Sequence, residues 1–277
     1  MSIDFPDTFT AENSERYVMS IRLCAGGLSF SANIPAEINS FFYSEVFFDD
    51  ERSYEESLKE FFFDNEFFSW GYKRVYVIAF SNRYAFMPEE LFDGKKVDDV
   101  MKFLFTKTES KCLESALKGE KGRILFDIEK GVYEFLFRSF VNPIFLHHLV
   151  PTLDLWYMQV KDSGLNKMFV SINRKTIDVI CFKDGEFRFI NSFEYGSVED
   201  IMFLILNVWK QMSFNQVDDE LLIGGGSFSM KLLLDNLRIF INNVNMIKLP
   251  SEAYLFGNGT SEIAAAPFDI IALAVCE

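Results

Sequence analysis

The stretch MFVSINRKTIDVICFKDGEFRFI, residues 168–190, decides the fold because it contains three consecutive β-strand patterns. Apolar and β-branched residues fill each run, and Lys183-Asp184-Gly185 joins the second run to the third as a hairpin turn. Ser197 is a favoured N-cap residue and predicts a helix over residues 198–212. The strand ELLIGGG follows at residues 220–226, so this half of the chain is predicted to form strand, strand, strand, helix, strand.

The first half of the chain repeats this order. Residues 16–34 predict a hairpin around Cys24-Ala25-Gly26-Gly27, and residues 40–48 predict a third strand. Ser53 and Glu56 have the spacing of a capping box for a helix over residues 54–68. Residues 73–80 predict a buried strand, followed by a loop that ends in MPEELF, residues 87–92.

The chain therefore looks like a duplication of one unit, with a first domain over residues 1–164 and a second over residues 165–277. The intervening sequence predicts a strand at 123–128, a helix at 132–140, a strand at 143–146 and a helix at 151–160. Lys161-Asp162-Ser163-Gly164 is polar, ends in glycine and marks the expected boundary. An apolar run in residues 261–277 predicts a closing helix or strand.

Composition and charge exclude several classes of function. The 277 residues carry a formal net charge of −14, whereas binding to a nucleic acid backbone depends on lysine and arginine. The apolar runs are far shorter than the ~20 residues of a membrane-spanning helix, so an integral membrane protein is not expected. The N-terminal residues lack the pattern of a secretory signal, and we expect a cytoplasmic protein.

Metal binding and a catalytic cysteine or histidine are also not expected. The four cysteines are scattered without a C-x-x-C motif, which is typical of free thiols in a reducing compartment. His147 and His148 are adjacent within an apolar stretch and are expected to be structural or to face a partner, since zinc ligands need another spacing. Acidic pairs such as Glu55-Glu56 and Asp218-Asp219 are expected on solvated faces.

The stretch LLIGGGSFSMKLLLDNL, residues 221–237, predicts a strand that turns through three glycines into a helix. Two interpretations of Gly224, Gly225 and Gly226 stay open. The turn could simply be tight, or the helix N-terminus behind it could bind an anion or nucleotide. The glycine spacing matches neither the dinucleotide-binding motif nor the P-loop motif.

The duplicated meander, helix, strand and glycine turn resemble the actin-like ATPase superfamily. The pattern is most similar to pilus-assembly and secretion proteins of the PilM and GspL kind, and to a bacterial family of unknown function with that fold. The resemblance implies a mixed α/β, ribonuclease H-like fold of two similar domains with a cleft between them.

The resemblance also implies a phosphate loop in each hairpin, with an aspartate that works on magnesium and water. Arg22 and Cys24 take the aspartate and glycine positions of the first copy, and Ser171 and Asn173 take them in the second. Loss of both carboxylates removes the evident magnesium anchor, so the protein is not expected to be an enzyme. We expect Asp178 and Asp184 to be surface or turn residues and Arg22 to be an exposed strand residue, with an anion contact as the alternative for Arg22.

Two functions follow from this comparison. The first is a non-catalytic actin-like scaffold or adaptor that binds another protein and needs no cofactor. The second is an ATP-binding protein or slow ATPase that holds ATP or ADP in the interdomain cleft. Its expected contacts are Gly224, Gly225, Gly226 and Ser227 with Arg22, Asn173, Arg174, Lys175 and Thr176. The oligomeric state and the partner are not predicted.

Overall fold

The computed structural model describes residues 5–49, 51–106, 109–119, 121–161, 164–225, 230–256 and 265–276. The chain forms two compact units. The first comprises Met1–Leu117, Lys121–Thr152 and Pro250–Glu277, and the second comprises Lys118–Glu120 and Leu153–Leu249. The C-terminal segment therefore lies in the first unit, while a domain division at Gly164 stays a prediction about the duplicated sequence.

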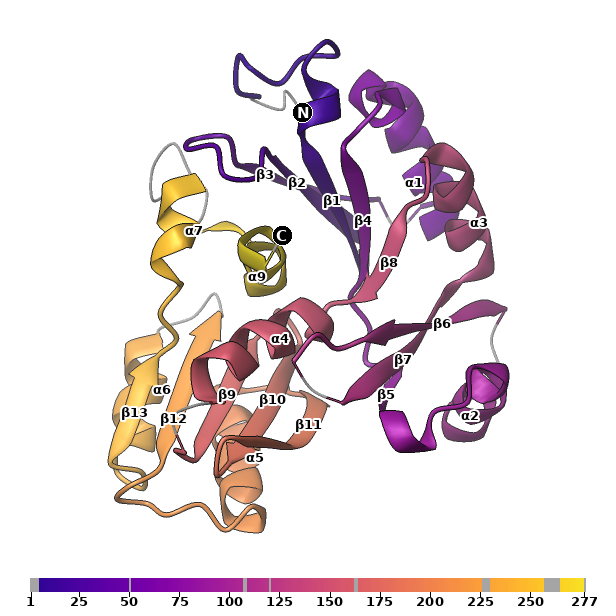
Figure 1. Ribbon diagram of the computed structural model, residues 1–277. Coiled ribbons are helices and arrows are strands. Elements are labelled where there is room, and N and C mark those ends of the chain that lie inside the picture. The colour runs from indigo at the N-terminus through magenta and orange to yellow at the C-terminus, as the bar shows by residue number, and fades with distance from the viewer. Residues whose placement is uncertain are drawn as a thin grey trace. The chain divides into compact units, whose positions relative to one another are not determined.

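A five-stranded mixed sheet forms the centre of the first unit, with the strand order β3-β2-β1-β4-β8 (Figure 1). Its strands are β1 (Val18–Cys24), β2 (Gly27–Asn33), β3 (Phe42–Phe47), β4 (Arg74–Ala79) and β8 (Ile144–His147). β1 pairs antiparallel with β2 and parallel with β4, so the turn of the first hairpin and the C-terminal end of β4 lie at the same end of the strands. The hairpin and the third strand expected from the sequence are confirmed.

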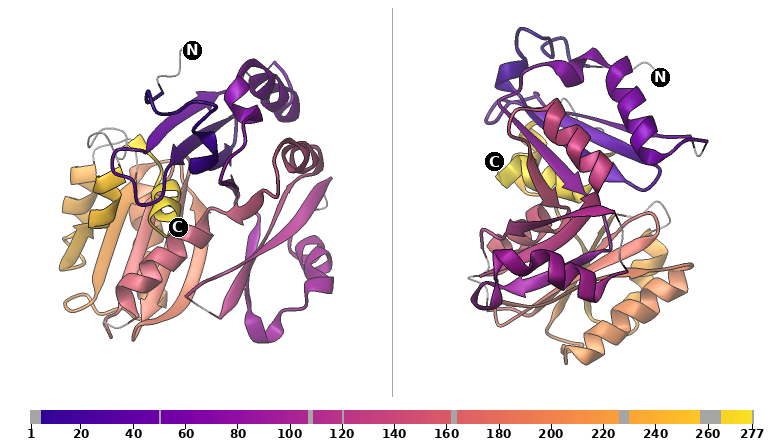
Figure 2. Two further views of the ribbon diagram at one scale, coloured as in Figure 1. Left: turned by 45° about the horizontal axis from the view of Figure 1, so that its top comes forward. Right: turned by 90° about the vertical axis from the view of Figure 1, so that its right-hand side faces the viewer.

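Helices cover both faces of this sheet. Figures 1 and 2 show α1 (Tyr54–Asp64) and α3 (Lys130–Ser139) on one face and α9 (Phe268–Cys276) on the other. Alternation along β1 explains the two layers, because Met19, Ile21 and Leu23 join the core under α1 and α3. Arg22 has the opposite orientation. Phenylalanine dominates this core, and the stacked rings of Phe62 and Phe68 lie 4.0 Å apart.

A smaller three-stranded antiparallel sheet completes the first unit, with the order β5-β7-β6. It contains β5 (Tyr84–Pro88), β6 (Ser110–Ala116) and β7 (Gly122–Glu129), and α2 (Val97–Leu104) packs against it. Short 3-10 helices lie at Ser14–Arg16, Glu66–Ser69, Glu89–Leu91 and Gly94–Lys96, and α7 (Ser251–Phe256) precedes α9. The expected loop that ends in MPEELF, residues 87–92, is wrong, because β5 occupies Tyr84–Pro88 and pairs with β7.

The second unit repeats the larger sheet with the order β11-β10-β9-β12-β13. Its strands are β9 (Lys167–Ile172), β10 (Thr176–Lys183), β11 (Glu186–Glu194), β12 (Glu220–Gly225) and β13 (Asn243–Met246). α5 (Val198–Gln211) and α6 (Met230–Leu237) share a core with one face, and Trp156 of α4 (Leu149–Val160) stacks on Phe169 of the other. The same strand order in both units confirms the duplicated order of elements inferred from the sequence.

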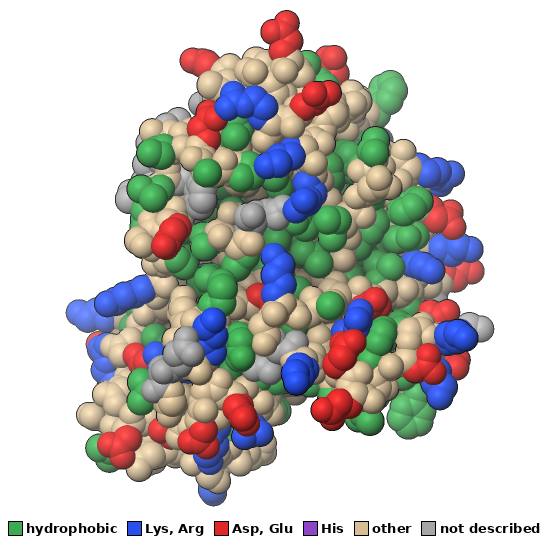
Figure 3. Space-filling view, viewed as in Figure 1, with side chains coloured by type: hydrophobic (Ala, Val, Ile, Leu, Met, Phe, Trp, Pro, Cys, Tyr) green, Lys and Arg blue, Asp and Glu red, His purple; other side chains and the backbone are tan. Residues whose placement is uncertain are grey.

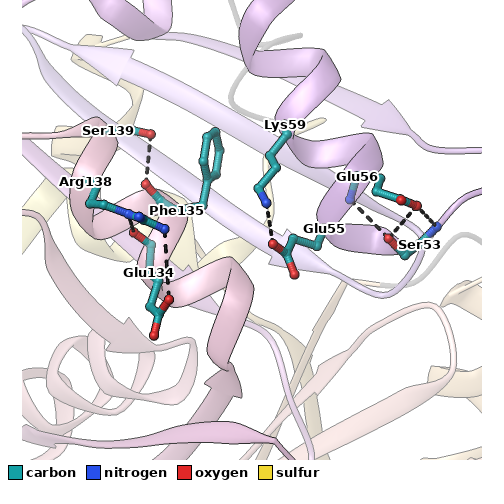
Figure 4. Close-up of polar contacts among 8 residues, drawn as sticks. All are labelled: Ser53, Glu55, Glu56, Lys59, Glu134, Phe135, Arg138 and Ser139. Atoms are coloured by element: carbon teal, nitrogen blue, oxygen red, sulfur yellow. Dashed lines mark hydrogen bonds and ion pairs between the residues drawn. The ribbon is translucent and has the colours of Figure 1, made fainter.

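Equivalent helices in the two units begin in the same way. Ser53 and Glu56 close the expected capping box on α1, and Ser197 forms a second box with Asp200 on α5. Figure 4 shows the α1 box beside the solvent-facing contacts of α1 and α3, including Lys59 with Glu55. Each box satisfies backbone N–H groups that a helix N-terminus otherwise leaves unpaired. No helix in the described part of the chain has the length and hydrophobicity needed to span a membrane.

Candidate functional site

The turn between β1 and β2 is the first of the two expected phosphate loops. Cys24 and Gly27 are the last residue pair of the hairpin, which leaves a two-residue turn of Ala25 and Gly26. Gly26 has a φ of +74°. A Cβ atom on Gly27 would lie 2.2 Å from the carbonyl oxygen of Val46, so β3 passes too close for any side chain there. The local geometry of this turn therefore requires both glycines.

Arg22, at the position of the missing aspartate, is buried rather than exposed, and the expectation of an exposed residue is wrong. Its Nε donates to Oδ2 of Asp269 on α9 at 2.6 Å, and its Nη1 donates to Sγ of Cys24 at 2.8 Å. The guanidinium carbon lies 4.2 Å from the ring centre of Phe80. Sequence patterning places Arg22 on the face opposite the apolar core, and α9 covers that face.

The electrostatic environment keeps Arg22 positively charged and the thiol of Cys24 neutral. Burial acts to lower the pKa of Arg22, but the charge and hydrogen bond of Asp269 outweigh it, so the pKa is raised. Burial raises the pKa of the Cys24 thiol, although the guanidinium of Arg22 opposes this shift. A protonated thiol is a poor nucleophile and metal ligand. The first turn therefore has a guanidinium at position 22, where the resemblance predicts an aspartate, and a protonated thiol at position 24.

A pocket of about 380 Å³ adjoins the first turn. Besides the turn, its lining includes Tyr54 from α1, Phe80 and Ser81 after β4, and Asp127 and Glu129 from β7. The carboxylate of Asp127 accepts from Nη2 of Arg83 at 2.8 Å and from the hydroxyl of Ser110 at 2.9 Å. The carboxylate of Asp127 is therefore held by contacts within the protein. Among the described residues, no group of three or more His, Cys, Asp or Glu side chains is arranged to hold a metal ion.

The second expected phosphate loop is the turn between β9 and β10, residues 173–175. Asn173 donates its backbone N–H to the carbonyl of Thr176 at 2.8 Å, and the hydroxyl of Tyr195 donates to the carbonyl of Asn173 at 2.7 Å. Arg174 and Lys175 are exposed, whereas Thr176 is buried. The turn therefore has a backbone fixed by hydrogen bonds and two cationic side chains on its outside.

Asp178 lies in the second unit opposite Ser171, its register partner on β9. The side chain is 2% exposed, so the expectation of a surface or turn residue is wrong. Its carboxylate accepts from Nδ2 of Asn173 at 2.8 Å and from the hydroxyl of Ser192 at 2.5 Å. Ser171, where the resemblance predicts an aspartate, therefore has a buried carboxylate opposite it on the neighbouring strand. Asp184 does lie in the β10–β11 turn, with a φ of +56°.

The structure brings Gly224 and Gly225 beside the second turn, since they pair in parallel register with Ser171 and Ile172. Gly225 has a φ of +79°, and a Cβ atom there would lie 2.2 Å from the carbonyl oxygen of Ile172. The backbone therefore needs glycine at 225 with or without a ligand. Gly226 and Ser227 lie outside the described residues, and Arg22 belongs to the other unit.

The two histidines are buried in the first unit at the end of β8. Nε2 of His147 lies 2.9 Å from the carbonyl oxygen of Ser81, and its ring lies 4.7 Å from that of Tyr84. Burial lowers the pKa of His147 well below its usual range, so the ring stays neutral. The ring of His148 lies 4.4 Å from Phe80. Both rings are therefore packed inside the first unit rather than on its surface.

Asp269 and the burial of Asp178 were not predicted from the sequence. Arg22 and Asp269 are 247 positions apart, and no local motif links them. Asp178 had one indirect signal, because it lies on a strand within an apolar run where a lone carboxylate needs hydrogen-bond partners.

Comparison with solved structures identifies the fold. A Bacteroides thetaiotaomicron protein with an actin-like ATPase fold and unknown function is similar over 100% of both chains, with 29% identity and a TM-score of 0.81. A chain of the PilM–PilN type IV pilus biogenesis complex is similar over 93% of this chain and 96% of its own, with 10% identity and a TM-score of 0.59. The protein therefore has an actin-like ATPase fold, as its sequence indicated.

No curated protein is similar enough to this chain to be matched in a sequence search. The model of a protein family of unknown function, DUF3822, matches residues 6–244. That match covers most of the 277 residues and includes both hairpins and the β12 strand. The chain belongs to the DUF3822 family.

Proposed function

We propose that this protein is a non-catalytic, cytoplasmic scaffold or adaptor that binds another protein. The observation that carries the proposal is the ion pair between Arg22 and Asp269. It puts a buried cation where a phosphate loop needs a carboxylate, and it uses that cation to hold α9. Because phosphoryl transfer relies on a metal held near the phosphates, this replacement argues against catalysis.

Exposed apolar side chains on the first unit support a protein partner. Phe137 of α3 is 52% exposed, Val141 in the following turn is 89% exposed, and Ile144 at the start of β8 is 38% exposed. Figure 3 shows hydrophobic side chains gathered in this region of the viewed face, with acidic and basic side chains interspersed around it. Large exposed apolar groups often mark protein interaction sites. The solved PilM–PilN complex gives a precedent for a partner bound by a protein of this fold.

A thermal-shift titration with ATP and ADP, with and without Mg²⁺, tests the loss of nucleotide binding. A ligand at 100 times its Kd adds about 2.7 kcal/mol to the free energy of unfolding and raises Tm. We expect no shift at millimolar nucleotide. A dose-dependent rise that disappears in the Arg174→Ala, Lys175→Ala variant would contradict the proposal, since these exposed side chains can be removed without disturbing the core.

Affinity purification tests for the partner directly. The wild type and a Val141→Asp variant would be compared as baits in extracts of the source cells. We expect a stoichiometric partner with the wild type that is lost with the variant, because the substitution puts a charge among exposed apolar groups. Equal recovery with both baits would assign the partner to another surface.

ATP binding is the second candidate, and the second unit supplies the observation that favours it. Gly224 and Gly225 lie in register beside the β9–β10 turn, and the Asp178 carboxylate lies opposite Ser171. Backbone N–H groups, the cations of Arg174 and Lys175 and a carboxylate are groups that nucleotides and magnesium use. A Mg²⁺-dependent rise in Tm with ATP that is lost in Asp178→Asn would favour this candidate. Without ATP, the Tm of this variant should match that of the wild type.

A further inference from the structure

We propose that a groove between β3 and α1 binds an extended, basic segment of the partner protein. The inference deepens the proposed adaptor function and rests on it. It concerns a part of the first unit that contributes nothing to the two phosphate loops. The groove encloses about 360 Å³ and lies at the free edge of the larger sheet.

One wall of the groove is a stripe of α1. Ser57, Glu60, Phe61 and Asp64 line it, and their spacing of three, four and seven residues places them on one face of the helix. Phe61 also packs on the core at 5.6 Å from Phe68, which fixes the position of the stripe. The helix therefore presents two carboxylates beside an aromatic floor.

The opposite wall is the end of β3 and the residues that follow it. Val46, Phe47 and Phe48 line the groove, and Phe47 is 57% exposed. β3 is an edge strand that pairs with β2 on one side only among the described strands. An edge strand has backbone N–H and C=O groups available to an added strand, and the neighbouring pocket selects alternate side chains of that strand.

The charge of the lining specifies the occupant. Asp49, Glu51, Glu60 and Asp64 are acidic, and Arg52 is the one basic residue among the lining residues. Arg52 forms an ion pair with Glu60, and more than half of each side chain is exposed. The carboxylate of Glu60 is therefore already paired with the guanidinium of Arg52 from the same chain. Arg52 also interacts electrostatically with Asp49. An incoming arginine or lysine can therefore gain favourable interactions with the other carboxylates of the lining, Glu51 and Asp64.

Aromatic side chains add the second requirement. Phe47, Phe48 and Phe61 line the same groove and can contact the aliphatic stem of a lysine or arginine, or the face of a guanidinium. An extended segment with basic residues alternating with β-branched residues would place its cations toward the carboxylates and its backbone along β3. A basic, extended protein segment is therefore the occupant that the groove fits.

Fluorescence polarisation with the full-length protein tests the proposal. The probe is a fluorescein-labelled peptide of alternating arginine and valine, about six residues long, which is the length of a typical strand. Matched peptides carry glutamine or glutamate in place of arginine. We expect the arginine peptide to bind, the glutamate peptide not to bind, and affinity to fall as salt rises from about 0.1 M to about 1 M.

Three variants locate the binding. Glu60→Lys should weaken the arginine peptide at least about fivefold, and Arg52→Ala should strengthen it about twofold to fivefold by releasing Glu60. Asp235→Lys is the matched control, because Asp235 of α6 pairs with Arg238, just after that helix, and is as exposed as Glu60, with 51% of each side chain exposed. Its affinity should stay within about twofold of the wild type.

Three results would overturn the assignment, two of which involve a bound peptide. One is equal binding of the arginine and glutamate peptides, and the other is an equal loss in Glu60→Lys and Asp235→Lys, which would indicate a general charge effect. Absence of peptide binding would also reject this groove, but it would leave the adaptor proposal standing. The adaptor proposal fails separately, through the nucleotide titration.

Discussion

At the scale of single residues, the first hairpin has a buried ion pair at the position where the resemblance to actin-like ATPases predicts an aspartate. Arg22 and Asp269 are both buried, and their contact joins β1 to the last helix of the chain. A buried ion pair adds little net stability compared with apolar residues of similar size, but breaking it leaves an uncompensated charge. The pair therefore fixes the position of α9 on β1 but adds little net stability.

The ion pair gives the first prediction. Asp269→Ala should lower the free energy of unfolding by about 3–5 kcal/mol, because it leaves the Arg22 charge buried without a partner. The double variant Arg22→Met, Asp269→Leu should recover most of that loss, since it removes both charges together. Chemical denaturation of the two variants and the wild type measures this. If the double variant is as unstable as the single one, packing rather than charge explains the effect.

His147 gives the second prediction, which concerns pH. Burial lowers the pKa of His147 in the folded protein, whereas an unfolded histidine titrates near 6.5. Below about pH 6.5 the unfolded chain therefore binds a proton that the folded chain does not, and stability falls by up to about 1.4 kcal/mol per pH unit. Above that pH the contribution is fully present.

His147→Gln should flatten this part of the pH dependence, because glutamine can still donate to the Ser81 carbonyl but does not titrate. Denaturation curves between about pH 5 and pH 8 make the comparison, relative to each protein's own stability at the upper end. Parallel curves for the wild type and the variant would show that another group causes the acid sensitivity.

At the scale of elements, close approach between neighbouring strands accounts for glycine at position 225 without a ligand. Gly26 and Gly225 have nearly equal φ values, +74° and +79°. A Cβ atom at Gly26 would meet nothing within 4 Å, whereas at Gly225 it would meet the Ile172 carbonyl oxygen. The two positions therefore share a backbone conformation that favours glycine, but they differ in the space available for a side chain.

This contrast gives the third prediction. Gly26→Ala should destabilise by about 1–2 kcal/mol, the cost of a side chain in the left-handed region. Gly225→Ala should cost at least about 1 kcal/mol more, because β9 or β12 must also move. Thermal unfolding of both variants compares them, with Gly26→Ala as the matched control. Equal losses would mean that β12 yields without cost and that a ligand is the better reason for glycine at 225.

The elements that could be predicted have strong local signals. Asp184-Gly185 forms its turn with positive φ at both residues, and Ser53 and Ser197 cap their helices. β13 was missed because Asn243–Met246 is short and polar, and its strand geometry comes from parallel pairing with β12. The candidate site was predicted less completely, because the partners of Arg22 and Asp178 come from other strands and from α9.

At the scale of the whole molecule, the chain returns to its first unit after completing the second. Ile270, Ile271 and Leu273 of α9 are buried, and Asp269 holds Arg22 from the same helix. The face of the larger sheet under α9 carries Ser20, Arg22 and Ser31, which are all buried. These polar side chains are kept from solvent by α9. The apolar core under α1 and α3 does not need α9 for its burial.

Removal of the C-terminal segment should therefore affect the two units unequally. A chain that ends at Leu249 loses the burial of three large apolar side chains, each worth roughly 1.5–3 kcal/mol, and leaves Arg22 unpaired. The core that α5 and α6 share with the second sheet lies within residues 168–244, and α4 on its other face also precedes Leu249, so the shortened chain keeps both. Hydrogen exchange should show lost protection in β1 and β2 but retained protection in β9, β10 and β12.

The full-length Asp269→Ala variant separates this expectation from a general failure of the shortened chain to fold. It should show the same unequal loss of protection in milder form, since α9 keeps its apolar contacts but loses its ion pair. Equal loss of protection in β1 and β9 in both proteins would mean that the two units unfold as one cooperative body. Loss confined to the first unit would establish α9 as the element on which the stability of that unit depends.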